Sequence, residues 1–355
     1  MKRKVCVVTG SRAEYGLLRP IIFEINKSKT LELLLMVTSM HLSEEFGKTA
    51  NLIEKDGLKI TYKVEMNPKE NTAESMAESI GRGILGITAA FHKKQPDITL
   101  LLGDRIEELA GAIVSAYLNI PIAHIHGGDK SKAGLDESAR HAITKLSHIH
   151  FAATKKSMER ILKMGEDPRK VFLVGAPGLD SILKGTFLSK SELSNKFGLD
   201  FNRSFLVMLQ HSVTTQIAQA GKQIKETLKA IEYLKLPTIA VFPNSDAGGR
   251  TIIGEIESKR GLFVEILKNI PRDLYLSLLK HASVLVGNSS GGVIETPSLK
   301  IPVVNIGIRQ AGRERSTNVI DVPHDKAKIV RAIRKALYDK KFKEQVRRCV
   351  SPYGD

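Results

Sequence analysis

The chain has 355 residues, 42% hydrophobic and 26% charged, which is the composition of a globular protein and excludes disordered and fibrous classes. At roughly 150 residues per domain this length predicts two domains. Lys and Arg (54) exceed Asp and Glu (38), and the net charge of +16 favours an anionic partner. Aromatic residues make up 5% and Trp is absent, which disfavours base stacking or a membrane-interface belt. We therefore expect a small anion as the ligand, and neither nucleic acid nor a membrane as a partner.

The start of the chain shows no targeting signal. Met1-Lys-Arg-Lys leads directly into a strand-like Val5-Cys-Val-Val, and no apolar run reaches the length of a membrane span. We expect a cytoplasmic protein. Cys6 and Cys349 are the only cysteines, too few for a disulfide framework or a cysteine-based zinc site, so both are expected to be free thiols.

Apolar runs of strand length alternate with longer amphipathic stretches along the chain, a pattern typical of parallel sheets built from β–α–β units. The predicted fold class is therefore α/β, with two Rossmann-like domains. Strands are expected at residues 5–9, 33–38, 60–64, 98–102, 122–126, 150–153 and 171–174 in the first half, and at 205–209, 238–241, 262–265, 284–287 and 303–305 in the second.

The boundary between the domains is expected near Gly175-Ala-Pro-Gly-Leu-Asp180, where Gly and Pro follow a strand. This gives a first domain of residues 1–178 and a second of residues 179–335, with the polar stretch 184–202 as a linker. Residues 325–348 carry ten Lys or Arg against three acids on a helical pattern. We interpret this stretch as a helix with solvated charges and with an inward-facing apolar side formed by Ile329, Ile333, Leu337 and Phe342.

Two strand ends carry candidate anion sites. The first strand ends in Thr9-Gly-Ser-Arg-Ala-Glu-Tyr-Gly16, where a helix begins, so that Gly10 and Arg12 could face an anion or could simply form a tight turn. The segment Gly287-Asn-Ser-Ser-Gly-Gly-Val-Ile-Glu295 is a stronger signal, because Ser289 and Ser290 stand at a predicted helix start, where a diphosphate is stabilised. Their alternative role is N-capping. Glu295 is suited to a ribose diol, or is a surface charge.

Further polar loops follow strands of the second half. Gln210-His211-Ser-Val-Thr214 and the loop of Asn244 and Asp246 should open on the same edge of the sheet. Arg309 and Arg313 follow the last expected strand, and their forked donors suit a phosphate or a uracil carbonyl.

The first half holds the acid–base candidates. Asp104 and Arg105 follow a buried strand, where they are either catalytic or a structural ion pair. His124-Ile-His126-Gly-Gly-Asp129 and then Asp136-Glu137 come next. His124 and His126 share a strand face and could bind a metal with Asp104 or Asp129, or could be buried structural imidazoles. We prefer general acid–base chemistry, because no stronger metal-binding spacing is present.

Taken together, these segments resemble the hydrolysing UDP-N-acetylglucosamine 2-epimerases over essentially the whole chain. The segments that carry the resemblance are Thr9 to Gly16, Gly103-Asp104-Arg105, Ile122 to Gly128, Asp136 to Lys145, Gly287-Asn-Ser-Ser290 and Asn305 to Gln310. The resemblance implies a glycosyltransferase-B architecture with a central cleft, in which UDP is held mainly by the second domain and the sugar lies against the first. It also implies that the final segment, residues 336–355, crosses back to the first domain.

The reaction implied by this resemblance converts UDP-N-acetylglucosamine and water to N-acetylmannosamine and UDP, on the way to sialic acid. UDP is eliminated to give a glycal, and water then adds with inversion at C2, without a cofactor or a metal. By motif, the catalytic set would be Asp104, His126, Asp129, Asp136 and Glu137. The UDP contacts would be Gly10, Arg12, Arg105, His211, Asn244, Asp246, Ser289, Ser290, Glu295, Arg309 and Arg313. We expect a homodimer or a homotetramer.

Three positions depart from the family pattern: His126 stands where some members carry a catalytic Glu, Asp129 stands where Glu is usual, and Gln210-His211-Ser replaces a more common His-Pro. The alternatives are hydrolysing epimerases of UDP- or GDP-linked 2,4-diacetamido-trideoxy sugars on the legionaminic acid route, a non-hydrolysing 2-epimerase, and a catalytically silent nucleotide-sugar sensor.

Overall fold

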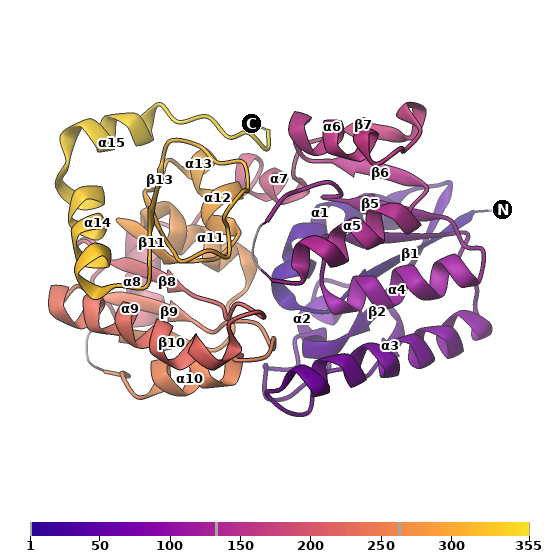
Figure 1. The fold of residues 1–355 in the computed structure, drawn as a ribbon, viewed down its shortest axis with the longest axis horizontal. Helices are drawn as coiled ribbons and strands as arrows, with labels where there is room; N and C mark the ends of the chain where they lie inside the picture. Colours follow the sequence, from indigo (N-terminus) through magenta and orange to yellow (C-terminus); the bar gives the residue numbers. More distant parts are fainter. Residues whose placement is uncertain (1, 132–133, 262–263, 355) are drawn as a thin grey trace. The chain divides into compact units, whose positions relative to one another are not determined.

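The computed structural model describes residues 2–131, 134–261 and 264–354. This part of the chain divides into two compact units, one built mainly from residues 2–130 and 135–178 and the other mainly from residues 179–353. Figure 1 colours the first from indigo to magenta and the second from rose to yellow. The change from one unit to the other at Gly178 and Leu179 follows the Gly–Pro turn after β7.

In the first unit, parallel strands form one sheet in the order β3-β2-β1-β4-β5-β6-β7. The strands are β1 (Arg3–Thr9), β2 (Leu31–Thr38), β3 (Ile60–Val64), β4 (Ile98–Leu102), β5 (Ile122–Ile125), β6 (Ile149–Ala152) and β7 (Val171–Leu173). The helices between them are α1 (Arg12–Lys27), α2 (Ala50–Lys55), α3 (Ala73–Lys93), α4 (Ile106–Tyr117), α5 (Asp136–Leu146) and α6 (Lys155–Lys163).

Alternation along β1 shows how this sheet is covered on both faces. Cys6 and Val8 pack in a core with residues of α3, α4 and α5, whereas Val5 and Val7 pack in a second core with residues of α1 and α2. Successive side chains of a strand point to opposite faces, so a continuous apolar run marks a strand that is buried on both sides. Figure 1 shows α3, α4 and α5 in a row beside the sheet.

The second unit repeats this plan with parallel strands in the order β10-β9-β8-β11-β12-β13. Its strands are β8 (Leu206–Leu209), β9 (Thr238–Val241), β10 (Val264–Leu267), β11 (Val284–Gly287), β12 (Val303–Ile306) and β13 (Val319–Val322). Its helices are α7 (Asp180–Leu183), α8 (Lys190–Phe197), α9 (Ala220–Leu234), α10 (Gly249–Glu257), α11 (Arg272–His281), α12 (Gly291–Ile294), α13 (Thr296–Leu299), α14 (Lys326–Tyr338) and α15 (Lys340–Arg347).

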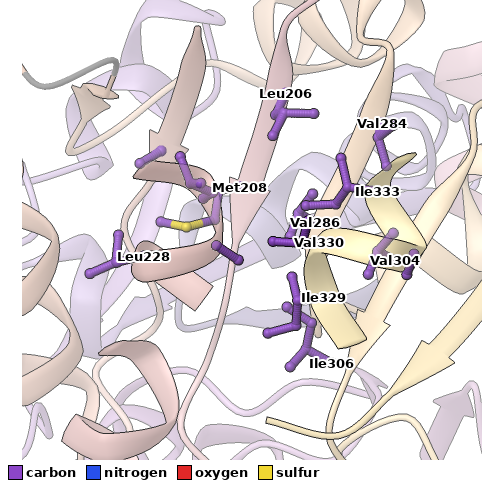
Figure 2. Packing of buried hydrophobic residues seen from close by; sticks show 14 of the residues in the cluster. Leu206, Met208, Leu228, Val284, Val286, Val304, Ile306, Ile329, Val330 and Ile333 are labelled. Carbon is purple, nitrogen blue, oxygen red and sulfur yellow. The ribbon is translucent and has the colours of Figure 1, made fainter. Parts of the chain in front are cut away.

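The core of the second unit lies between its sheet and the helices α9, α10, α14 and α15. Figure 2 shows Val330 and Ile333 of α14 beside Val286 of β11, with Ile306 of β12 close to Ile329. The predicted inward side of the basic C-terminal segment is confirmed, because Ile329, Ile333, Leu337 and Phe342 are all buried there. The return of residues 336–355 to the first domain stays a prediction.

The α/β fold class with two Rossmann-like sheets is confirmed, and the local differences have physical reasons. The stretch 184–202, predicted as a linker, contains α8, which begins in a capping box of Ser189 and Glu192 and buries Leu193. Strand β13 is missing from the prediction. Of the strand expected at 262–265, residues 262 and 263 lie outside the described residues, and β10 begins at Val264. Cys6 and Cys349 are buried free thiols. Among the helices of the described ranges, none is long and apolar enough to cross a membrane.

Candidate functional site

Several of the predicted site residues follow strands at the point in each sheet where the strand order reverses. That point lies between β1 and β4 in the first sheet and between β8 and β11 in the second. Gly10 follows β1 and Asp104 follows β4, while His211 follows β8 and Ser289 follows β11. In doubly wound sheets, ligands bind outside the carboxyl ends of the strands at this reversal. Each unit therefore has its own candidate binding edge.

At the end of β4, the Asp104 carboxylate forms an ion pair with Arg140 of α5. The two side chains differ in accessibility: 20% of the Asp104 side chain is exposed, against 2% for Arg140. Arg105, the neighbour expected as an ion-pair partner for Asp104, instead donates to Glu107 over 3.1 Å. Solvent therefore reaches the Asp104 carboxylate, whereas the guanidinium that neutralises it is buried.

The loop after β5 is sharply kinked and held from several sides. His126 and Gly128 both have left-handed backbones, with φ of 62° and 70°. At Gly128 a Cβ would lie 2.4 Å from the Ser157 carbonyl oxygen, so only glycine fits. The Gly128 carbonyl accepts from Arg160, and the Asp129 carbonyl accepts from Arg140 over 3.0 Å. The loop therefore depends on two arginines from different helices.

The Asp129 carboxylate is buried and bound at both oxygens. Oδ1 accepts from the Ser157 hydroxyl over 2.7 Å, and Oδ2 lies 3.1 Å from Nδ1 of His126. Only 2% of the Asp129 side chain and 8% of the His126 side chain is exposed. A carboxylate that accepts from an imidazole N–H fixes the orientation and the tautomer of the ring, so the two residues form one acid–base unit.

His124 has a structural role. Its Nε2 donates to the Gly103 carbonyl over 2.7 Å, and its Nδ1 lies 3.2 Å from the Thr144 hydroxyl. Burial lowers its pKa to about 4, so the ring is neutral at physiological pH. In the parts of the chain that the structure describes, no three His, Cys, Asp or Glu side chains gather as a metal-ion site.

The remaining predicted acids of the first unit, Asp136 and Glu137, occupy the first turn of α5. Both are half-buried, and Glu137 lies 3.9 Å from Nε2 of His141 one turn further along. Acidic side chains are favoured in the first turn of a helix by its dipole. Arg140 follows on the buried side of the same helix, so α5 carries both candidate acids and the cation that pairs with Asp104.

The loop after β1 differs from the simple anion cradle that the sequence suggested. The Gly10 N–H donates to Glu14 Oε2 over 2.6 Å, and the Ser11 hydroxyl accepts from the Glu14 N–H over 3.3 Å. Gly10 is nevertheless required as glycine, because a Cβ there would lie 2.5 Å from the Glu107 side chain. Arg12 begins α1 directly after this turn. Of the predicted donors, the Gly10 N–H is thus already engaged inside the protein.

Beneath this loop lies a buried carboxyl cluster that sequence reasoning missed. Glu14, Glu107 and Glu108 are 4%, 0% and 0% exposed. Burial raises the pKa of Glu14, and burial together with the Glu14 charge raises the pKa of Glu108 well above its usual value. Two buried carboxyl groups that repel each other cannot both ionise at low cost, so the pair favours retention of one shared proton. The sequence signal that could have indicated this cluster is the presence of three acidic residues close to Gly10 and Arg105.

This cluster predicts how stability depends on pH. A carboxyl group whose pKa is raised by folding stabilises the protein at low pH, and this contribution is lost as pH rises through the folded pKa. We expect the unfolding free energy of the first unit to fall as pH rises above the ordinary Glu pKa of about 4.3. Glu108→Gln should flatten this dependence, whereas the exposed control Glu159→Gln should retain it. Urea unfolding at a series of pH values measures the slopes; equal slopes for Glu108→Gln and wild type would contradict the shared proton.

In the second unit, Asn288 organises the edge of the sheet. Its side chain accepts from the His211 N–H over 2.7 Å and donates to the His211 carbonyl over 2.9 Å. Its own carbonyl accepts from Gln310 over 2.9 Å and from Arg309 over 3.3 Å. Asn288 lies within the quoted motif, yet nothing in the sequence distinguished it from the serines that follow. It joins the loops after β8, β11 and β12.

A hydrogen bond to the His211 ring fixes its orientation and its neutral tautomer. Its Nδ1 accepts from the Asn244 N–H over 3.2 Å, so a neutral ring carries its proton on Nε2. His211 is 8% exposed. An Nε2–H donor at the carboxyl edge of the sheet is suited to a phosphate oxygen. Asp246, two residues after Asn244, accepts from the Gly249 N–H through its carbonyl over 2.8 Å, and its side chain is half-buried.

The two predicted serines have different surroundings. The Ser289 hydroxyl accepts from the Gly291 N–H over 3.3 Å, whereas Ser290 makes no capping bond with its side chain. The helix that follows, α12, has only four residues, because Pro297 interrupts the backbone hydrogen bonding and opens α13. The predicted helix start after Ser290 is confirmed, although α12 is short and α13 follows it directly.

Glu295 is also paired within the unit. Its Oε1 accepts from Arg272 of α11 over 2.7 Å, and both side chains are largely buried, at 5% and 11% exposed. Arg309 and Arg313 lie half-buried in the loop after β12. The second unit therefore brings imidazole, hydroxyl and guanidinium donors to one edge of its sheet, and Glu295 adds a carboxylate whose charge Arg272 balances.

The fold belongs to a known class. Two α/β units with parallel sheets and polar residues at the strand reversals define an enzyme fold of the glycosyltransferase-B type. The solved UDP-N-acetylglucosamine 2-epimerase of Neisseria meningitidis bound to UDP-N-acetylglucosamine aligns over 99% of this chain and 96% of its own, with a TM-score of 0.81 at 21% identity. The Methanocaldococcus jannaschii enzyme aligns over 99% of this chain and 96% of its own, with a TM-score of 0.77 at 22% identity.

The family follows from sequence comparison. The model of the UDP-N-acetylglucosamine 2-epimerase family matches residues 23–355, so the chain belongs to that family. A UDP-N,N'-diacetylbacillosamine 2-epimerase (hydrolyzing) of Legionella pneumophila is 39% identical over 97% of this chain and 91% of its own. A polysialic acid biosynthesis protein P7 of Escherichia coli is 36% identical over 99% of this chain and 90% of its own. A UDP-N-acetylglucosamine 2-epimerase of Neisseria meningitidis is 33% identical over 96% of this chain and 89% of its own.

Proposed function

We propose that the protein is a hydrolysing 2-epimerase that converts a UDP-linked 2-acetamido sugar and water to UDP and the free, C2-inverted sugar. The observation that carries this proposal is family membership together with an accessible carboxylate, Asp104, at the strand reversal of the first sheet. The hydrolysing outcome is supported by the Legionella relative, whose description names a hydrolysing enzyme.

The substrate we propose is UDP-N-acetylglucosamine, giving N-acetylmannosamine. A second candidate is UDP-N,N'-diacetylbacillosamine, which is named for the Legionella relative at 39% identity and, as a GDP- or UDP-sugar, for a Campylobacter jejuni relative at 35% identity. The two sugars differ at C4 and C6, so the chemistry at C1 and C2 is the same for both. The proposal for the reaction therefore does not depend on this choice.

The first unit supplies the proton transfers in this proposal. Removal of the C2 proton with departure of UDP from C1 gives a glycal, and addition of water across the double bond returns a proton to C2 on the opposite face. Both steps need positioned acids and bases. Asp104 and the His126–Asp129 unit are the leading candidates, because Asp104 is partly accessible and Asp129 orients the imidazole. Asp136 and Glu137, on the first turn of α5, are the further acids.

The second unit supplies the UDP contacts. Departure of UDP leaves negative charge on the diphosphate, which preorganised donors stabilise. We assign this role to His211, Ser289, Ser290, Arg309 and Arg313, with Asn244, Asp246 and Glu295 around the nucleoside. From the first unit, Arg12 and Arg105 are the candidate cations for the diphosphate side, and Gly10 shapes the turn that precedes them. None of these assignments requires a metal or a cofactor.

The reaction itself is testable with a panel of nucleotide sugars. With UDP-N-acetylglucosamine or UDP-N,N'-diacetylbacillosamine, wild-type protein should release UDP in the presence of EDTA, and the GDP counterparts of both sugars are assayed in parallel for release of GDP. In D₂O the C2-inverted product should carry deuterium at C2, because the glycal takes its new proton from solvent. Proton NMR of the product shows both the deuterium content and the configuration at C2. A product that keeps its C2 hydrogen and configuration would show a simple nucleotide-sugar hydrolase, and return of the nucleotide-linked epimer without UDP would show a non-hydrolysing enzyme.

The UDP pocket is tested separately by calorimetry. Ser290→Ala and Arg309→Ala should each weaken UDP binding by about 1 to 3 kcal/mol, the usual range for a hydrogen bond to a charged group. Lys341→Ala, an exposed residue of α15, serves as the control and should leave the affinity unchanged. Unchanged affinity in both pocket variants would place the nucleotide elsewhere.

A further inference from the structure

Arg140 is an unusual residue on the inner face of α5. The buried residues of this helix are Ala139, Arg140, Ile143 and Thr144, and Arg140 is 1% exposed. Arginine is almost never fully buried unless it is paired, because removing its charge from water is costly. Arg140 is not among the proposed catalytic or UDP-binding residues, so another role must account for the cost of burying its charge.

The two ends of its guanidinium contact the two parts of the site that are proposed to move protons. Nη2 forms the ion pair with the Asp104 carboxylate after β4, and Nη1 donates over 3.0 Å to the Asp129 carbonyl after β5. A planar, forked donor can hold two acceptors at a fixed separation, which an ammonium on a flexible chain cannot do. Arg140 therefore connects the two loops.

Two neighbouring arginines contact other acceptors. Arg105 is turned to Glu107 of α4, and Arg160 of α6 donates to the Gly128 carbonyl. The backbone of Arg140 is itself fixed, because its carbonyl accepts from the Thr144 hydroxyl, and Thr144 also faces the buried His124 ring. His124 also contacts the Gly103 carbonyl, so the start of the loop that carries Asp104 belongs to the same hydrogen-bond network.

We propose that Arg140 is a positioning residue that holds the Asp104 carboxylate and the loop carrying His126 and Asp129 in the arrangement that proton transfer requires. This inference rests on the proposed function for its catalytic consequence. The geometric part, that Arg140 fixes both loops, stands independently. Arg140 contacts no substrate in this account and acts only through Asp104 and the β5 loop.

Kinetics of R140M and R140K test the catalytic consequence. We expect R140M to lower kcat by about 10²-fold, the scale of a misplaced reacting group, with KM and the calorimetric UDP affinity within about threefold of wild type, less than the tenfold that 1.4 kcal/mol represents. R140K keeps the positive charge but not the fork, so it should lose less. Arg169→Met, an exposed arginine of the same unit, is the matched control. Near-normal kcat in R140M, or equal losses of kcat and UDP affinity, would overturn the proposal.

A double-mutant cycle distinguishes positioning from a general structural effect. If Arg140 acts through Asp104, the variant D104N/R140M should be about as slow as D104N alone, because the residue that Arg140 orients is already disabled. Losses that multiply would show independent roles and contradict the proposal. If R140M does not fold, the same cycle is run with R140K.

A crystal structure of R140K, compared with one of the wild type, keeps this inference separate from the proposed function. Displacement of the Asp104 carboxylate and of residues 126–129 is expected, and both loops in unchanged positions would overturn the positioning role. If wild-type protein turned over no nucleotide sugar, the proposed function would fail while this structural comparison would still decide whether Arg140 fixes the two loops.

Discussion

The ion pair between Arg140 and Asp104 is the interaction on which the first unit's site depends. Removing one partner of such a pair leaves an uncompensated charge in a poorly solvated place, which is far more costly than the pair itself is favourable. Because the guanidinium is buried and the Asp104 side chain is partly exposed, the pair fixes the carboxylate without burying it. The same guanidinium holds the β5 loop, so the ends of two neighbouring strands share one anchor.

In the second unit, the loops at the strand reversal are connected by a neutral residue, Asn288. The Asn288 side chain accepts from and donates to the backbone of the loop after β8, and the Asn288 main-chain carbonyl accepts from Gln310 of the loop after β12. Gly287 permits the close approach, since a Cβ there would lie 2.1 Å from the Leu209 carbonyl oxygen, at a φ of 133°. As a neutral residue, Asn288 adds no charge to a sheet edge that also carries Arg309 and Arg313.

Much of the fold could be predicted because a strand buried on both faces has a continuous apolar run, as in Val5 to Val8. Elements without that signal were missed: β13 is short and half-exposed, and α8 is polar except for Leu193 and Phe197. The motifs indicated which strand ends carry polar residues. They could not indicate that Asp104 pairs with Arg140 rather than with its neighbour Arg105, because that choice depends on how α5 packs beside the sheet. Pro297, which lies in the first turn of the helix that follows α12, was visible in the sequence.

The central claim is that Asp104 acts in the chemistry while the second unit binds UDP. Steady-state UDP release by wild type and by Asp104→Asn, with UDP affinity measured by calorimetry on the same preparations, tests it most directly. The account predicts that Asp104→Asn lowers UDP release by at least about 10²-fold, the scale of a lost general acid–base group, with unchanged UDP affinity. Near-normal turnover by this variant would contradict the account and leave Asp104 with a structural role only.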